Sequence, residues 1–199
     1  MISLDSETTG IDFAHGTKPF FVTTCNEKQE QQFWEWPVDP LTRQPIIPDG
    51  EFKEIRELIL SAPRLILQNA KFDVTALATI DPSLQHNWPW EKTEDTLISA
   101  HLLSSNTPHD LTSLAVQYLS VNIQKYEDEL EEACNQCRRL CRSQFPEWLI
   151  AKAGLPCMPS AKAKCWKADT WLPRAVATQL DYPENHPYWT VLSDYANVD

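Results

Sequence analysis

The sequence predicts an α/β protein with a five-stranded sheet flanked by helices, and two observations carry this prediction. The chain opens with three short segments rich in aromatic and β-branched residues, joined by two short connections, which favours an antiparallel meander. Two further short extended segments then alternate with segments of helical periodicity. This order of elements indicates a sheet covered by helices.

The first three strands are expected at residues 2–7, 19–25 and 32–36, the last ending at Pro37. The apolar run 64–68 predicts a short buried strand, and residues 92–94 a last short one. Four prolines make 37–50 a loop, and the proline-containing stretch 81–91 is expected to be another.

Helices follow from apolar residues at helical spacing. Residues 51–61 place Phe52, Ile55 and Ile59 on one face, and Pro63 ends that helix. Asp110 is expected to cap a helix over the following residues. The other expected helices are 71–79, 95–104, 124–145, one opened by Pro146 and closed by Gly154, and 188–199, with 155–187 mixed.

The 199-residue chain has 42% hydrophobic and 23% charged residues, an ordinary balance for one globular domain. Acidic residues interrupt the N-terminus where a signal peptide would be apolar, and no run reaches the length of a membrane span. We therefore expect a cytoplasmic protein with no membrane partner and six reduced cysteines. The net charge of −11 argues against a broad electrostatic grip on duplex nucleic acid, but not against a site that meets phosphate through metal ions.

The first candidate site lies in the first strand, where Asp5 and Glu7 are two residues apart. Alternate side chains of a strand share a face, so the two carboxylates leave it on the same side. They repel each other, and hard divalent cations with oxygen ligands offset that repulsion. Taken alone, the triplet is better explained as the solvated acidic end of an edge strand, and a metal site needs partners elsewhere in the chain.

The second candidate follows the buried strand 64–68, where Asp73 falls in the first turn of a helix near the carboxyl end of a strand. Ligands of open α/β sheets gather at such ends. The alternatives are an aspartate that stabilises the helix start and an Asn69 that caps it.

The third candidate pairs Tyr195 with Asp199, four residues apart and therefore on one face of a helix. A surface tyrosine near an acidic terminus is the alternative.

Together these residues resemble the DnaQ-like 3′–5′ exonucleases, specifically the tyrosine-type (DEDDy) proofreading domain of family A DNA polymerases. The matching motifs are D-x-E-T at Asp5, Glu7 and Thr8, N-x-x-F/Y-D at Asn69, Phe72 and Asp73, and Y-x-x-x-D at Tyr195 and Asp199. The segment opened by Glu94-Asp95-Thr96 is also similar to the family. The stretch 127–187 is longer and richer in tryptophan than the compact bacterial pattern, and looks more like bacteriophage-type polymerases.

The resemblance implies an RNase H-like mixed sheet with a helical insertion at about 127–187, and a site for two Mg²⁺ or Mn²⁺ ions. Asp5, Glu7, Asp73 and Asp199 would hold the ions, and Tyr195 would orient the attacking water. Thr8 and Asn69 would contact the 3′-terminal nucleotide, Ile11 would be an apolar wedge and Phe72 would lie beside the metal site. Tyr126 is a looser match to an aromatic platform, and equally a core tyrosine.

The implied function is removal of nucleoside monophosphates from single-stranded or frayed DNA 3′ ends, as the proofreading module of a polymerase. Residues 1–199 would then form the exonuclease domain, with a truncated last helix and a polymerase domain C-terminal to it in the same chain. The alternatives are an RNA 3′ exonuclease of the RNase D type and a non-catalytic nucleic-acid-binding domain of the same fold.

Four other signals favour structural interpretations. Cys134, Cys137 and Cys141 repeat at helical spacing and indicate a buried helix face better than a zinc site. Arg138, Arg139 and Arg142 fit a solvated face, with phosphate contact as the alternative. His101 and His109 are expected to be structural. The lysines at 162, 164 and 167 form the best basic patch, and such clusters are usually solvated.

Overall fold

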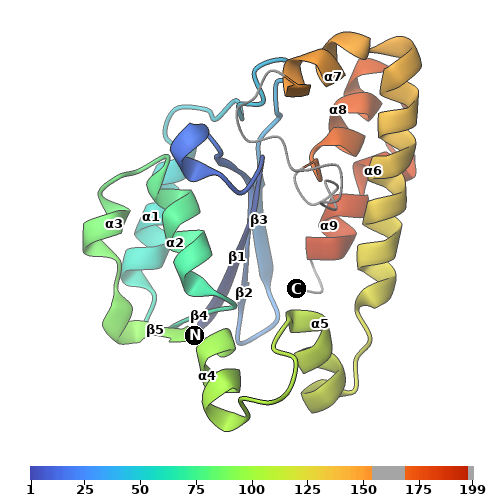
Figure 1. Ribbon diagram of the computed structural model, residues 1–199. Coiled ribbons are helices and arrows are strands. Elements are labelled where there is room, and N and C mark those ends of the chain that lie inside the picture. Colours follow the sequence, from blue (N-terminus) through green and yellow to red (C-terminus); the bar gives the residue numbers. More distant parts are fainter. Residues whose placement is uncertain (154–168, 197–199) are drawn as a thin grey trace.

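The computed structural model describes residues 1–153 and 169–196, and in it a central sheet separates two groups of helices (Figure 1). The sheet has five strands in the order β3-β2-β1-β4-β5. The strands are β1 Ile2–Thr8, β2 Pro19–Asn26, β3 Gln31–Glu35, β4 Leu65–Leu67 and β5 Thr93–Asp95. β1, β2 and β3 pair antiparallel, whereas β4 and β5 run parallel to β1, so the sheet is mixed, as in the RNase H-like fold.

All five predicted strands are present, each with ends within two residues of the prediction. The antiparallel meander is also confirmed, because short connections join β1 to β2 and β2 to β3. β1 is the central strand, and β4 pairs with its beginning through Ile2 and Ser3. The carboxyl half of β1 therefore extends beyond β4 and leaves room there for the helix that follows β4.

Nine α-helices surround the sheet in the described part of the chain. They are α1 Glu51–Ser61, α2 Ala70–Ala78, α3 Leu84–Asn87, α4 Thr96–Leu103, α5 Leu111–Leu114, α6 Gln124–Gln144, α7 Pro146–Ala153, α8 Leu172–Gln179 and α9 Val191–Ala196. Short 3₁₀ turns occur at Phe13–His15, Trp90–Lys92 and Pro187–Trp189, and a π-helical turn at Ala115–Leu119 continues α5.

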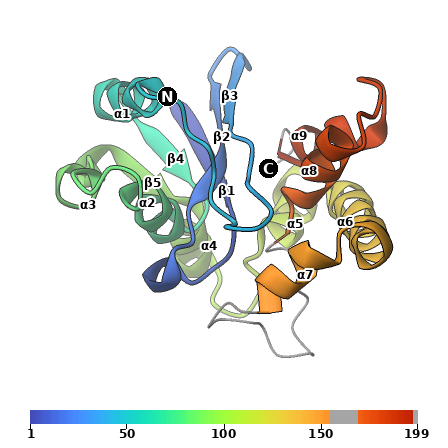
Figure 2. The same ribbon diagram turned by 90° about the horizontal axis from the view of Figure 1, so that it is seen from above.

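The helices form one layer on each side of the sheet. Seen from above, α1, α2 and α3 lie on one side and α6, α7, α8 and α9 on the other (Figure 2). Leu4, Val22 and Trp34 pack with α1 and α2 in one hydrophobic core, and Phe21 packs with α6, α8 and α9 in the second. No described helix is both long enough and apolar enough to cross a lipid bilayer.

Most predicted helices are present, and α1 has the predicted bounds. Asp110 caps α5 as expected, because its Oδ1 accepts a hydrogen bond from Ser113 N at 2.9 Å. The predictions of a plain loop at 81–91 and of mixed structure throughout 155–187 were incomplete, since α3 and α8 form there. Pro173 lies at the start of α8, where proline is compatible with a helix. Gly154 and the three lysines lie outside the described residues.

Candidate active site

Asp5 and Glu7 both leave β1 on the side that faces α6, α8 and α9. The residues between and beside them, Leu4, Ser6 and Thr8, are buried toward the other side, against α1 and α2. This alternation follows from the two-residue period of a strand. The predicted common face of the two carboxylates is therefore present.

Asp73 comes to the same end of β1 from α2. Its side chain is 1% exposed, and its Oδ1 accepts a hydrogen bond of 2.6 Å from the Ser6 hydroxyl. Ser6 lies between Asp5 and Glu7 in the chain but points to the opposite face, toward α2. This hydrogen bond joins the motif that ends at Asp73 to the motif on β1. The two meet because α2 packs against β1 where β1 extends past the end of β4.

The carboxylates of Asp5 and Asp73 are close enough to influence each other. Burial raises the pKa of Asp73 well above its ordinary value, and the negative charge of Asp5 raises it further. Burial also raises the pKa of Asp5, partly offset by a hydrogen bond from the Ser6 backbone. In the described part of the chain neither carboxylate has a cationic side-chain partner. A buried carboxylate beside a half-buried one, with no cationic side chain of the described residues between them, is a costly arrangement for a purely structural role.

The start of α2 is held by a side chain other than the predicted one. Asn69 occupies the cap position, as in the alternative interpretation, in a left-handed conformation (φ 62°), but its side chain makes no cap hydrogen bond. Instead the Asp95 carboxylate accepts hydrogen bonds from Asn69 N at 3.1 Å and Ala70 N at 2.9 Å. The same carboxylate accepts from Leu97 N at 2.9 Å and so also caps α4. The Asn69 side chain is left free of the cap.

Glu7 is contacted by a residue from the insertion. Thr170 Oγ1 donates a hydrogen bond of 3.4 Å to Glu7 Oε2. The neighbouring Asp169 is 2% exposed and pairs with Arg43 and with Arg138, whose Nε lies 3.0 Å from Asp169 Oδ2. This ion-pair network anchors the segment that carries Thr170. The sequence gives no sign of it, because Arg43 and Asp169 are 126 residues apart.

Arg138 therefore has a different environment from the predicted one. The prediction of a solvated face holds for Arg139, whose side chain is 67% exposed and lies 3.9 Å from Glu132. It is wrong for Arg138, which is largely buried against Asp169. Cys134, Cys137 and Cys141 are fully buried free thiols, which confirms the buried helix face. Burial raises the pKa of Cys137 to about 12, and all three thiols stay protonated at neutral pH.

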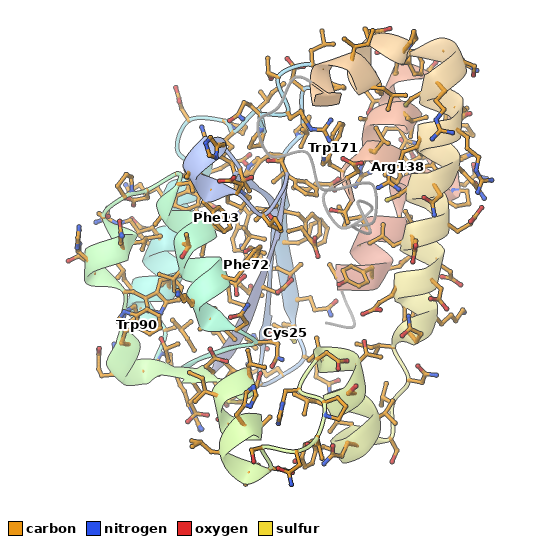
Figure 3. The ribbon with its side chains drawn as sticks, in the orientation of Figure 1. Phe13, Cys25, Phe72, Trp90, Arg138 and Trp171 are labelled. Atoms are coloured by element: carbon orange, nitrogen blue, oxygen red, sulfur yellow. The ribbon has the colours of Figure 1, made fainter. Side chains whose placement is uncertain are left out.

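The remaining predicted residues are distributed around the carboxylates. Thr8 is buried and donates its hydroxyl to Gly10 O at 2.5 Å, whereas Ile11 is 81% exposed. Phe72 is half-buried and packs edge-to-face on Phe13, with ring centroids 5.3 Å apart (Figure 3). Tyr126 is half-buried at the start of α6, with Lys125 Nζ 5.8 Å from its ring centre. His101 and His109 stack on each other, with ring centroids 3.7 Å apart.

The third motif is described in part. Tyr195 lies on α9, half-buried against the core that α6, α8 and α9 share with the sheet. Asp199 lies outside the described residues. Among the residues that are described, no three His, Cys, Asp or Glu side chains cluster as a metal-binding group. The donor set of Asp5, Glu7 and Asp73 nevertheless has the chemistry that hard divalent cations require, since it consists of carboxylate oxygens without protein cations to neutralise Asp5 and Asp73.

Comparison with known proteins found one family and similar solved structures. A sequence model of a family described as 3′-5′ exonuclease matches residues 1–146, which hold the sheet and all of α6. Two solved structures of NrnC from Brucella melitensis, one of them bound to pGG, are similar at 16% sequence identity. Each likeness covers 98% of this chain and 79% of that chain, with TM-scores of 0.46 for the pGG complex and 0.42 for the other. No curated protein sequence matches the chain.

Proposed function

Because the chain belongs to the 3′-5′ exonuclease family, we propose that it removes nucleoside monophosphates from single-stranded or frayed DNA 3′ ends with two bound divalent cations. The observation that carries this proposal is the approach of Asp73 on α2 to Asp5 on β1, beside Glu7 on the same strand. Such carboxylates fit cations, and exonuclease domains of this fold generally use divalent metal ions.

Asp5, Glu7, Asp73 and Asp199 would hold two Mg²⁺ or Mn²⁺ ions. When bound, the ions supply positive charge for the attacking and leaving oxygens of the phosphodiester. Ser6 fixes the Asp73 carboxylate, and Thr170 fixes that of Glu7, so both are oriented before any ion arrives. Tyr195 orients the attacking water from the opposite helical layer.

The 3′ nucleotide is held by the rim of the site. Thr8 and Asn69 contact it, and the Asn69 side chain is available because Asp95 caps α2 in its place. The exposed Ile11 separates the last bases, Phe72 supports the nucleotide beside the metal site, and Tyr126 is a stacking platform for the strand. A frayed end enters such a site at lower cost than a paired one, which suits the proofreading module of a family A polymerase.

The direct test is metal-dependent shortening of labelled oligonucleotides. Purified protein with Mg²⁺ or Mn²⁺ is expected to release mononucleotides from a 5′-labelled single strand, one at a time from its 3′ end, and EDTA is expected to stop the reaction. Asp5→Asn is expected to abolish it, while Asp49→Asn, in an exposed loop, keeps it. Intact oligonucleotides with wild-type protein and either metal would contradict the proposal and leave a non-catalytic binding domain.

Two comparisons define the role more closely. Proofreading predicts faster removal of a mismatched than of a matched primer end, because the mismatched end frays more readily. Equal rates at the two ends would contradict the proofreading role. Faster cleavage of RNA than of a DNA oligonucleotide of the same sequence would favour the RNA exonuclease alternative.

A further inference from the structure

A pocket of about 360 Å³ lies between β3 and the helical layer, apart from the carboxylates. Four tryptophans line it: Trp36 after β3, Trp148 on α7, Trp171 before α8 and Trp189 in the turn before α9. These residues come from four separate elements, and three belong to the segment 146–189, beyond the family match. The volume is within the range of small-molecule sites.

The charged groups that line the pocket neutralise each other, which favours a neutral ligand. Arg174 Nε donates to Glu35 Oε1 at 2.6 Å, and the guanidinium lies over Trp189, 5.0 Å from the ring centre. Because Glu35 neutralises this guanidinium, the pocket is not built for an anion. Trp171 is 2% exposed, and its Nε1–H has no hydrogen-bond partner in the described part of the chain. A buried donor of this kind favours a planar ligand that carries acceptor atoms.

The pocket is on the same side of the sheet as the carboxylates. Glu35 and Glu7 both pair with Phe21, so they are two strand spacings apart, roughly 10 Å between backbones. Trp171 directly follows Thr170, whose hydroxyl contacts Glu7. A strand whose 3′ end lies at Asp5 and Glu7 therefore has the pocket within reach of its upstream nucleotides.

A buried ion-pair network lies between the two places. Asp169 pairs with both Arg43 and Arg138, so one carboxylate serves two guanidiniums in a protein of net charge −11. Arg138 Nη2 is buried without a partner among the described residues, and Arg43 lies over Trp171, 4.8 Å from its ring centre. Figure 3 places Arg138 and Trp171 together on this side of the sheet. These buried ion pairs hold the segment that carries Thr170 and Trp171 in place between Glu7 and the pocket.

From these observations we propose that the tryptophan pocket binds a nucleobase of the substrate strand, upstream of the 3′ nucleotide. The inference rests on the proposed exonuclease function and names a subsite for it. Aromatic walls suit any base, because every base has a π-face, and the subsite therefore favours longer strands without reading their sequence.

The test measures affinity as a function of strand length. Fluorescein-labelled oligothymidylates of two to eight nucleotides are titrated with protein in Ca²⁺ in place of Mg²⁺, so that the carboxylates are neutralised, and oligonucleotides found intact after the titration are scored. Wild-type protein is expected to gain about tenfold or more in affinity at the length that reaches the pocket. Trp189→Ala removes one wall, and Thr178→Trp, at an exposed position on the pocket rim, fills the mouth. Both are expected to lose this gain.

The matched control is Trp90→Ala, an exposed tryptophan at the opposite edge of the molecule (Figure 3). This variant is expected to keep the full length dependence. Length profiles of Trp189→Ala and Thr178→Trp that superimpose on that of the control would overturn the inference. Failure of the exonuclease proposal is a separate result, since it is seen as intact oligonucleotides when wild-type protein is given Mg²⁺ or Mn²⁺.

Discussion

The two halves of the molecule contribute to the candidate site by different physical means. The sheet half supplies the carboxylates of Asp5, Glu7 and Asp73, and it holds them with neutral hydrogen bonds such as that from Ser6. The other half, called the helical wall below, consists of α6 to α9 and residues 169–171 before α8. It contacts Glu7 through Thr170, and buried ion pairs of Asp169 with Arg43 and Arg138 hold it in place. The sheet half therefore leaves Asp5 and Asp73 without a cationic partner among the described residues, whereas the helical wall pairs Asp169 with Arg43 and Arg138.

The largest loss of activity is expected when a carboxylate of the sheet half is neutralised. Asp73→Asn keeps an acceptor for Ser6 but removes a cation ligand, so cleavage should fall by roughly a thousandfold. The same change should raise the melting temperature of metal-free protein at pH 7. Because burial and Asp5 raise the pKa of Asp73, its ionised form costs stability as the pH rises through that raised pKa, and the cost is absent below the ordinary carboxyl range.

Calorimetry at pH 4 and pH 7, with and without Mg²⁺, checks this prediction. The stability difference between Asp73→Asn and wild type should shrink at pH 4, and Mg²⁺ should raise the melting temperature of wild type more than that of the variant. A variant that is less stable than wild type at pH 7 without metal would show that the Asp73 charge is paired after all.

Breaking the ion-pair network tests the other half of the comparison. Asp169→Ala leaves two largely buried guanidiniums without their carboxylate, and we expect it to cost about 3–5 kcal/mol of unfolding free energy. Urea denaturation measures the loss. The matched control is Glu94→Gln, which breaks an ion pair with Arg64 that is about half exposed and is worth about 1 kcal/mol or less. Similar losses for the two variants would remove the distinction between buried and exposed pairs.

The same division explains what the sequence could predict. Strand and helix patterns are local, so the five strands and α1 were found from residue periodicity, and Asp73 was placed correctly in the first turn of α2. The exonuclease resemblance follows from three short motifs on these elements. Arg138 follows Cys134 by four residues and so shares the buried helix face, which the exposed Arg139 does not. The partner of Arg138 could not be predicted, because its pairing with Asp169 is a tertiary contact.

Asn69 is at the cap position of α2, but the side chain that accepts the hydrogen bonds there belongs to Asp95. Asn69 has a left-handed backbone, and its N–H donates a hydrogen bond to the Asp95 carboxylate. Asp95 is the last residue of β5, which runs parallel to β4 beside it. Asp95 was expected at the opening of α4, but its second set of bonds depends on the parallel pairing of β4 and β5. The position of α2, and with it of Asp73, is thus set by a residue 22 positions further along the chain than Asp73 itself.

A smaller effect is expected from removing this double cap. Asp95→Ala should cost about 2 kcal/mol of unfolding free energy, since the starts of both α2 and α4 lose their acceptor. Asp110→Ala, which affects the cap of α5, should cost about half as much. Activity should also fall in Asp95→Ala, because α2 carries Asn69 and Asp73. Equal losses of stability for the two variants, measured in urea, would contradict the double role of Asp95.

The smallest loss of activity is expected from a variant that tests whether Thr170 orients the Glu7 carboxylate. Thr170→Val preserves shape but removes the hydroxyl that donates to Glu7, and a hydrogen bond of 3.4 Å to a carboxylate is worth about 1 kcal/mol. We therefore expect kcat to fall about fivefold while unfolding free energy changes by less than about 1 kcal/mol. Thr170→Ser should restore kcat, because it restores the donor. A fall in kcat that the serine variant does not restore would mean that Thr170 acts through packing beside Trp171, and Glu7 would then be oriented by the sheet half alone.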